Sequence, residues 1–147
     1  MPEPVLFKGA RVVDPASGRD EIGDVLVDWG VIASPRASSA TVLDCVGLVL
    51  APGIVDIPTH YDAQLGWDAS ASPSNLHGVT TVIGGNCGFT IAPIGDTDGD
   101  YLRRMMAKVE GMPLAALENG VAWDWESFGD YLSRLDGRLG VNAGFLV

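Results

Sequence analysis

The segment APGIVDIPTHYDAQ, residues 51–64, decides the fold. Its central part, IVDIPTH, is apolar at most positions, which is typical of a strand buried on both faces of a parallel sheet. Functional side chains in parallel α/β folds gather at the carboxyl ends of the strands. His60 stands at such an end and is a candidate metal ligand, because a neutral imidazole binds zinc well. The alternative is a histidine that is hydrogen-bonded in a core or a loop.

Pro58 makes this segment unusual. Residues two apart on a strand point to the same side, so Pro58 and His60 face the same way. A histidine at position 58 would complete a His-x-His metal pair, but proline offers no lone pair to a metal and no N–H to the sheet. The segment is therefore either a metal site with one ligand missing or a strand end that happens to carry a histidine.

Upstream of Gly53 the sequence is typical of a small β module. Apolar and β-branched runs alternate with segments rich in Pro, Gly, Ser and Asp, which punctuate strands. These runs lie at 5–14, 24–33 and 41–52. We expect residues 1–52 to form a small β-sandwich or barrel-like module, with Cys45 buried in the middle of its third strand.

Downstream of Pro52, strands alternate with helices. The predicted elements are a buried strand at Thr80–Gly84, a strand in 141–147, and helices within 98–111 and 124–137, the second capped by Asp124. This alternation indicates parallel βα units in residues 53–147. They supply too few strands to close an eight-stranded barrel, which takes about 250 residues.

The bulk composition narrows the class of protein. A net charge of −10 and a pI near 4.3 argue against a nucleic-acid partner, which needs clustered Lys and Arg. The hydrophobic share of 47% is too high for a disordered chain. Neither a signal-peptide pattern nor an apolar run of about 20 residues is present, so we expect no membrane partner. The two cysteines fit a reducing compartment, and we expect a cytoplasmic protein.

Further candidates surround the two buried strands. Cys87, in GGNCG, closes the second strand, where a thiolate is a strong zinc ligand and flanking glycines allow close approach. The alternative for Cys87 is a small buried hydrophobic residue. Four polar residues are candidates for lining a substrate pocket, although such loop residues are often simply solvated: Asp62, Gln64, Asp68 and Asn86. Motifs for nucleotide binding or serine hydrolysis are missing from the sequence.

Together these motifs resemble a known family. GLVLAPGIVDIPTHYDAQ (47–64) is similar to the entry into the first barrel strand of the amidohydrolase superfamily, where the usual text is APGFVDIHTHYDAQ. The segments 77–94, 100–136 and 141–147 resemble the N-acyl-D-amino-acid deacylase (D-aminoacylase) branch. The resemblance covers essentially the whole chain and is most specific over residues 48–147.

The resemblance implies a metal-dependent (β/α)8 TIM barrel with a small β-sandwich built from both chain ends. Residues 1–52 would be the N-terminal share of that sandwich, and residues 53–147 the first βα units of a barrel that is incomplete in this chain. The implied reaction is hydrolysis of a carbon–nitrogen, non-peptide amide bond, which converts an N-acyl-D-amino acid into a carboxylate and a D-amino acid. In such enzymes zinc lowers the pKa of a bound water and polarises the acyl carbonyl.

Carried over by position, His60 matches the second histidine of the His-x-His pair and Cys87 matches the metal-binding cysteine. Pro58 replaces the first histidine, which threatens a weaker second metal site more than the first. The general-base aspartate is expected beyond residue 147, so no catalytic residue is assigned within the chain.

Two hypotheses follow from this resemblance. The chain is the N-terminal part of a D-aminoacylase-like enzyme and is inactive alone, or it is a degenerate, non-catalytic fragment that serves as an assembly partner. In either case we expect an unclosed barrel edge to expose apolar surface and to favour self-association.

Overall fold

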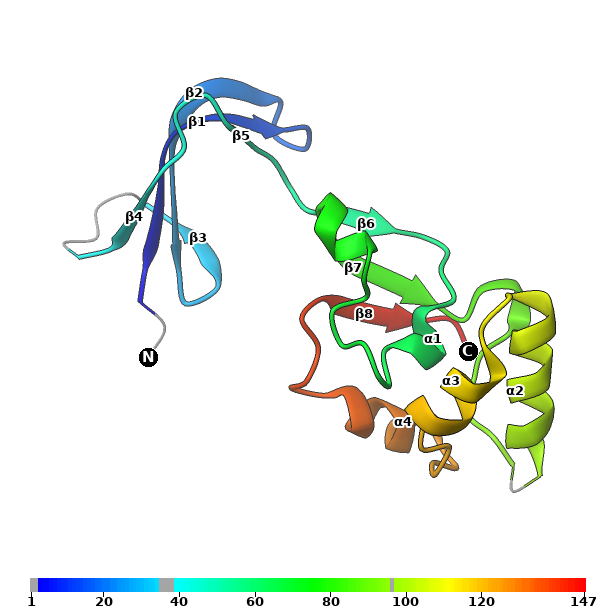
Figure 1. Ribbon diagram of the computed structural model, residues 1–147. Helices are drawn as coiled ribbons and strands as arrows, with labels where there is room; N and C mark the ends of the chain where they lie inside the picture. The colour runs from blue at the N-terminus through cyan, green and yellow to red at the C-terminus, as the bar shows by residue number, and fades with distance from the viewer. Residues whose placement is uncertain (1–2, 35–38, 96) are drawn as a thin grey trace. The chain divides into compact units, whose positions relative to one another are not determined.

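The computed structural model describes residues 3–34, 39–95 and 97–147, which fold as two compact units, Met1–Pro52 and Gly53–Val147 (Figure 1). The segment between the runs predicted at 24–33 and 41–52 falls largely on residues 35–38, which lie outside the described residues. Across the described ranges, every helix is too short or too polar to cross a membrane.

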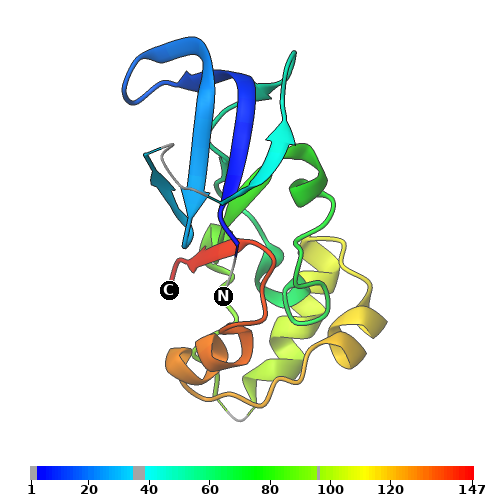
Figure 2. The ribbon, with the colours of Figure 1, turned by 90° about the vertical axis from the view of Figure 1, so that its left-hand side faces the viewer.

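The first unit is built on a long β-hairpin. Strands β1 (Val5–Asp14) and β2 (Arg19–Asp28) pair antiparallel and lie side by side in both ribbon views (Figures 1 and 2). The Asp14 carboxylate accepts hydrogen bonds from the Ala16 N–H, at 3.1 Å, and the Ser17 hydroxyl, at 2.5 Å. These bonds stabilise the turn in the way that aspartate commonly does. The sequence prediction of a strand at 5–14 is confirmed.

The remaining strands of this unit are short. Strand β3 (Val31–Ala33) pairs with β2, while β4 (Thr41–Asp44) and β5 (Val49–Leu50) both pair parallel with β1. The sheet order is β3-β2-β1-β4, with β5 also on β1. In the described part of the unit these strands form one sheet. The β-sandwich predicted for residues 1–52 therefore stays a prediction.

Two of the predicted strands are interrupted by turns. The prediction of a single strand at 24–33 is wrong. Trp29 and Gly30 adopt φ values of 51° and 76° and reverse the chain between β2 and β3. Positive φ at two successive residues is the geometry of a type I′ hairpin turn.

The run at 41–52 is likewise divided, and the predicted position of Cys45 in mid-strand is wrong. Asp44 accepts a hydrogen bond from the Val46 N–H at 3.1 Å and Gly47 has a φ of 82°, which together end β4. Cys45 lies in the turn and is only partly buried against Ala10 and Val12.

The second unit contains a parallel three-stranded sheet in the order β6-β7-β8 (Figure 1). Its strands are β6 (Ile54–Asp56), β7 (Val79–Gly84) and β8 (Asn142–Phe145). The predicted strands at 80–84 and 141–147 are confirmed, and so is the parallel βα arrangement.

Helices connect these parallel strands. They are α1 (Tyr61–Gln64), α2 (Asp98–Val109), α3 (Leu114–Gly120) and α4 (Phe128–Leu135), with 3-10 turns η1 (Ser74–His77) and η2 (Asn86–Gly88). Helices α2 and α4 confirm the predicted ones, whereas α3 was not predicted.

Ser127, and not Asp124, caps α4. The Ser127 hydroxyl accepts a hydrogen bond from the Asp130 N–H at 3.1 Å, and the Asp130 carboxylate accepts one from the Ser127 N–H at 3.0 Å. This reciprocal pair is a capping box. The predicted cap Asp124 instead pairs with Arg134 at 2.7 Å. The cap prediction was wrong because the helix begins three residues later than its first apolar residue suggests.

The core of the second unit lies between the sheet and these helices. Tyr131 of α4 packs edge-on against Phe145 of β8, with ring centroids 5.1 Å apart, and both ribbon views place α4 next to β8 (Figures 1 and 2). The Trp125 indole N–H donates to the Ile91 carbonyl at 2.8 Å, which satisfies a polar group inside the core. Met106 and Leu117 bring α2 and α3 into the same cluster.

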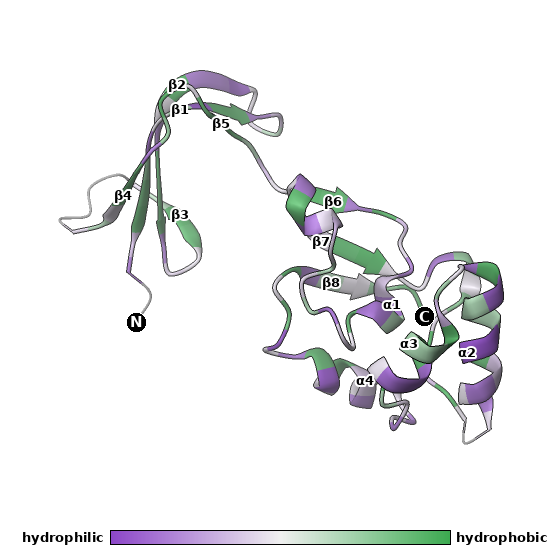
Figure 3. Ribbon diagram, viewed as in Figure 1, coloured by the Kyte–Doolittle hydropathy of each residue, from purple (hydrophilic) through white to green (hydrophobic). Residues whose placement is uncertain are grey.

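Strand β6 departs from the expected burial. Ile54, Val55 and Ile57 are all more than half exposed, Ile57 at 64%, although the run was predicted to be buried on both faces. The reason is that β6 is an edge strand that pairs only with β7 within the described residues. Figure 3 shows the hydrophobic colouring of β6 and β7. The apolar run thus predicts the strand correctly, but the strand is more exposed to solvent than expected.

Candidate functional site

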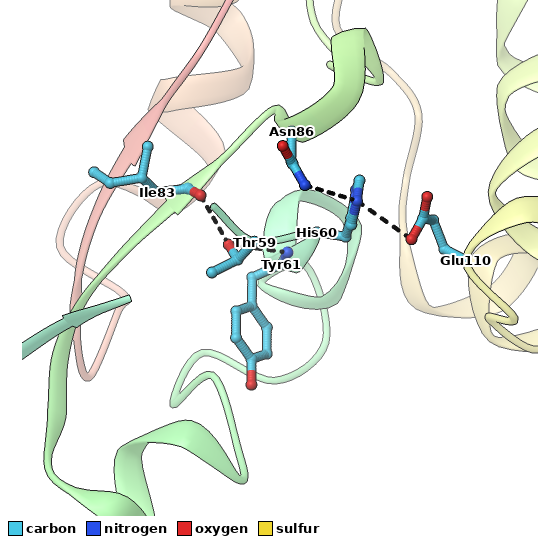
Figure 4. A network of polar contacts seen from close by, with 6 residues as sticks. All are labelled: Thr59, His60, Tyr61, Ile83, Asn86 and Glu110. Carbon is cyan, nitrogen blue, oxygen red and sulfur yellow. Dashed lines mark hydrogen bonds and ion pairs between the residues drawn. The ribbon is translucent and has the colours of Figure 1, made fainter. Parts of the chain in front are cut away.

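His60 lies just beyond the carboxyl end of β6, at the start of α1 (Figure 4). The preceding residue anchors it to the neighbouring strand. The Thr59 N–H and the Thr59 hydroxyl both donate to the Ile83 carbonyl, at 2.8 and 3.0 Å. The end of β6 is thereby fixed beside the end of β7, where strand-end side chains of a parallel sheet converge.

The His60 ring contacts two polar side chains through one nitrogen. Its Nε2 lies 3.2 Å from a carboxylate oxygen of Glu110 and 3.4 Å from the amide nitrogen of Asn86. The side chains of His60 and Glu110 are 18% and 19% exposed. The other ring nitrogen, Nδ1, is buried and has no hydrogen-bond partner among the described residues. The structure therefore brings together two predicted site residues, His60 and Asn86, with a third that was not predicted.

Glu110 is the functional candidate that sequence reasoning missed. It is the C-cap residue of α2, and its N–H donates to the Met106 carbonyl at 3.0 Å. A carboxylate at a helix C-terminus is unfavourable, because the last carbonyl groups carry partial negative charge. That misplaced charge, directly before Gly111, is the one local signal that could have drawn attention to it.

Cys87 lies on the loop after β7, within η2. Its φ of 56° is in the left-handed region, between Gly85 at 80° and Gly88 at 75°. The thiol is free and exposed, so the alternative of a small buried hydrophobic residue does not describe it. Within the described part of the chain, no hydrogen bond joins Cys87 to His60.

Gly85 holds this loop against the end of the chain. A Cβ at this position would overlap the Leu146 carbonyl oxygen, so only glycine fits. The Leu146 N–H donates to the Gly84 carbonyl at 3.0 Å, which extends the β7–β8 pairing up to the loop.

Asp62 is a buried carboxylate that lies next to Gly84, at the start of the loop after β7. It is 1% exposed, and a Cβ on Gly84 would lie within 2.9 Å of all three of its carboxylate atoms. Burial raises the pKa of Asp62, and backbone hydrogen bonds from Gly85 and from Asp62 itself only partly oppose this. Its Oδ2 atom is buried without a hydrogen-bond partner among the described residues.

A cavity of about 330 Å³ opens beside Asp62, lined also by Trp67, Tyr131 and Arg134. The Tyr131 hydroxyl donates to the Asp62 backbone carbonyl at 3.0 Å. Burial raises the pKa of Tyr131 as well, so its phenol stays protonated and remains a donor. The pocket role predicted for Asp62 stays a prediction.

Gln64 and Asp68 use their polar atoms to shape the loop that they belong to. The Gln64 amide donates to the Ser72 carbonyl at 2.7 Å and to the Asp68 carboxylate at 3.1 Å. Asp68 also accepts from the N–H groups of Ser70 and Ser72, at 3.1 and 2.8 Å. Their predicted contribution to a substrate pocket stays a prediction.

The predicted zinc ligands do not by themselves form a zinc site. Catalytic zinc takes three protein ligands and structural zinc takes four. Among the residues that the structure describes, His, Cys, Asp and Glu side chains nowhere gather in a group of three or more that could hold one ion. Pro58 offers no donor to such a group. The donors that the structure does bring together are His60, Asn86 and Glu110.

Comparison with known proteins gives consistent matches. The model of the Amidohydrolase family matches residues 41–146. The D-aminoacylase of Alcaligenes xylosoxydans xylosoxydans is 32% identical over 152 residues, covering 100% of this chain and 29% of the relative. The N-acyl-D-aspartate deacylase of the same organism is 37% identical over 93 residues, covering 60% of this chain and 19% of the relative.

A solved structure of D-aminoacylase, which concerns its binuclear metal centre, superposes with a TM-score of 0.74 at 30% identity. It covers 99% of this chain and 30% of the solved one. The chain thus spans less than a third of the length of these relatives.

Proposed function

This chain belongs to the amidohydrolase family, and we propose that it forms the N-terminal part of an enzyme that hydrolyses N-acyl-D-amino acids. Its fold is that of the start of a D-aminoacylase-type TIM-barrel protein, in which a small β module precedes the first βα units. The proposed reaction breaks the amide carbon–nitrogen bond and releases a carboxylate and a D-amino acid.

The match to D-aminoacylase along essentially the whole chain, in sequence and in fold, carries this proposal. The position of His60 supports it, because the residue stands at the carboxyl end of a parallel strand. A metal cofactor is typical of these relatives, and zinc is part of the proposal for the whole protein. A cytoplasmic location also belongs to it, since both cysteines are free thiols.

We expect the 147-residue chain to be inactive alone. The described residues lack a three-ligand metal group, and the general base is expected beyond residue 147. An assay of the purified chain with zinc and N-acetyl-D-methionine should therefore give no turnover above that of zinc alone. Measurable hydrolysis would contradict this expectation.

A chimera tests the proposed substrate class. In this chimera the 147-residue chain would replace the 29% of the Alcaligenes D-aminoacylase that it matches. The chimera should hydrolyse N-acetyl-D-methionine and not the L-enantiomer, and a Pro58→His variant serves as the matched control for the metal pair. A chimera with a native-like circular dichroism spectrum that cleaves neither enantiomer in either version would contradict the proposal.

The second candidate is a non-catalytic assembly partner, which Pro58 and the exposed β6 edge favour. Exposed aliphatic side chains on an edge strand favour association. The chain should then self-associate and bind a hydrophobic dye. A monomer by light scattering that leaves the dye fluorescence unchanged would exclude this candidate.

A further inference from the structure

We infer that the cavity beside Asp62 binds a small carboxylate with an apolar body, whose charge is received at the mouth by Arg134 and Arg138. The cavity measures about 330 Å³, a volume typical of small-molecule sites. The described residues that line it do not include His60 or Cys87. The inference therefore goes beyond the proposed hydrolysis and does not rest on it.

Three segments of the second unit form the walls of this cavity (Figure 1). They are the chain that follows α1, the connection between α3 and α4, and α4 with the turn after it. The apolar and aromatic side chains on these walls are Leu65, Trp67, Val121, Trp125, Tyr131 and Leu135. All of them except Trp67 are buried. A ligand with an apolar body would therefore remove that body from water by binding here.

Close contacts hold the aromatic wall in place. The Trp125 indole N–H donates to a backbone carbonyl at 2.8 Å, and the Tyr131 hydroxyl donates to the Asp62 backbone carbonyl at 3.0 Å. A Cβ on Gly120 would lie 2.7 Å from the Trp67 ring, so this tryptophan packs closely on the end of α3. A wall that is fixed in this way loses little freedom when a ligand binds.

Two arginines stand at the mouth of the cavity. Arg134 lies in the last turn of α4 and Arg138 in the turn that follows, and both are exposed. The Arg138 guanidinium donates to the Arg134 backbone carbonyl at 3.4 Å, so its side chain folds back onto the end of the helix. Arg134 pairs with Asp124 at 2.7 Å, whereas Arg138 has no carboxylate partner among the described residues. An anion at the mouth would compensate this second charge.

The charge of the mouth differs from that of the chain as a whole. The chain has nine Lys and Arg against nineteen Asp and Glu. The described lining of the cavity has two arginines and a single carboxylate, that of Asp62. A local excess of positive charge beside apolar walls raises the concentration of anions at that point.

Asp62 determines which way round the ligand lies. Its side chain is buried, so it borders the inner part of the cavity, away from the exposed arginines. A carboxyl group at the inner end offers an anion no positive charge and repels it when ionised. The carboxylate of the ligand therefore faces the mouth, and its apolar body points inward.

The chemistry of the mouth favours a carboxylate in particular. The planar guanidinium of arginine matches the two oxygens of a carboxylate and binds them through two parallel hydrogen bonds. Inorganic anions such as phosphate or sulfate have no apolar body and would leave the aromatic walls unused. An aryl-substituted short-chain carboxylate uses both parts of the site, and phenylpropionate is the probe of this class.

The test is a titration of the 147-residue chain with phenylpropionate, followed by NMR of the four tryptophan indole N–H signals. Trp67 and Trp125 line the cavity, whereas Trp29 lies in the turn between β2 and β3 and is the internal control. We expect saturable shifts of the Trp67 and Trp125 signals and none of the Trp29 signal. Phenylpropanol, which has no charge, and acetate, which has no apolar body, should each bind about tenfold more weakly.

Substitutions at the mouth test the role of the arginines. Arg138→Gln should weaken binding about tenfold, because it removes the charge that has no carboxylate partner among the described residues. Arg104→Gln is the matched control, the same change at an exposed arginine of α2, and should leave the affinity unchanged. Arg138→Lys keeps the charge without the planar guanidinium and should give an intermediate affinity. Circular dichroism shows whether each variant is folded.

Several results would overturn the inference. They are the absence of saturable shifts, equal affinities for phenylpropionate and phenylpropanol, equal losses for Arg138→Gln and Arg104→Gln, and a Trp29 shift as large as that of Trp67. Tighter binding of para-carboxyphenylpropionate would also overturn it, because a second carboxylate would lie beside Asp62. The ligand series uses the unmodified chain, so it decides the inference even where a variant fails to fold.

Discussion

The two units of this chain achieve their folds by different means. Among the described residues, the second unit, Gly53–Val147, has a cluster of thirteen buried side chains from its sheet, its loops and its helices. In the described part of the first unit, Met1–Pro52, the cluster has three members on one sheet, Ala10, Val12 and Val25. Large aliphatic side chains of the first unit remain open to solvent, Ile32 at 80% exposure. The hydrogen-bonded ladder of β1 and β2 therefore contributes more to the first unit than burial does.

This contrast indicates where substitutions will have large effects. Stabilisation by burial scales with the apolar area removed from water, so a unit with a larger core has more to lose at each core position. A sheet that exposes one face depends instead on its turns and on cross-strand pairs. Substitutions in the two units therefore test this contrast.

Truncation of a core side chain should give the largest difference in lost stability between the two units. Trp125→Ala removes a buried indole that donates to Ile91 and stacks on Trp123, and should lower the unfolding free energy of the second unit by about 3–5 kcal/mol. Val25→Ala, in the first unit, should cost only about 1–2 kcal/mol. Urea unfolding followed by helical circular dichroism reports on the second unit, which contains the described helices. If Val25→Ala moved the helical transition as far as Trp125→Ala does, the contrast would fail.

Two glycines with similar φ values offer a second comparison. Gly85 has a φ of 80° and lies so close to Leu146 that a Cβ would overlap its carbonyl oxygen, whereas Gly18 has a φ of 73° and open space around it. Gly85→Ala should destabilise by about 2–5 kcal/mol through strain and overlap, and Gly18→Ala by about 1–2 kcal/mol through strain alone. Thermal unfolding of both variants measures the difference. Equal effects would show that the loop after β7 can move away from Leu146.

The cap of α4 should have an intermediate effect. Ser127→Ala removes the hydroxyl that accepts from the Asp130 N–H, and should cost the second unit about 0.5–2 kcal/mol. Ser133→Ala, in the same helix, loses only a bond to the Gly129 carbonyl and is the matched control. Chemical unfolding of the two variants gives the comparison, and a larger loss for Ser133→Ala would contradict the assigned cap.

The smallest expected effect is a dependence on pH at the same cap. Hydrogen bonds from the Ser127 hydroxyl and N–H lower the pKa of Asp130 below its ordinary value of 3.8. Because the folded-state pKa is the lower one, ionised Asp130 favours the folded state above pH 3.8, and this contribution is lost as the pH falls through the folded-state pKa. The wild-type chain should lose more stability on acidification than Asp130→Asn. Parallel losses in urea titrations at neutral and acidic pH would refute the prediction.

Much of the fold could be predicted because its signals are local. The apolar and β-branched run at 5–14 and the apolar stripes of α2 and α4 identify their elements without knowledge of their neighbours. The turn at Trp29 and Gly30 was missed because a tryptophan with positive φ is rare. Helix α3 was missed because it is short and buries only Leu117, although Pro113 before it and Gly120 at its end are recognised boundary signals.

The candidate site could be predicted only in part. The position of His60 follows from the end of an apolar strand, and Asn86 follows from the loop after the next strand. Glu110 contacts His60 from a different helix, and no periodicity of the sequence links residues so far apart. The burial of β6 was overestimated for a related reason, since an apolar run does not reveal whether a strand has one neighbour or two.

The central place of β7 has a consequence for the order in which the second unit folds during synthesis. The contact between Thr59 and Ile83 spans 24 residues, whereas that between Thr80 and Asn142 spans 62. The longer loop costs about 0.8 kcal/mol more to close, a modest entropic difference. The larger delay is one of translation, because β8 reaches the end of the ribosomal tunnel only after α2, α3 and α4 have been made. A pair of strands is marginal by itself, and domains fold as units, so β6 and β7 gain a stable partner only once β8 and the helices before it have been made.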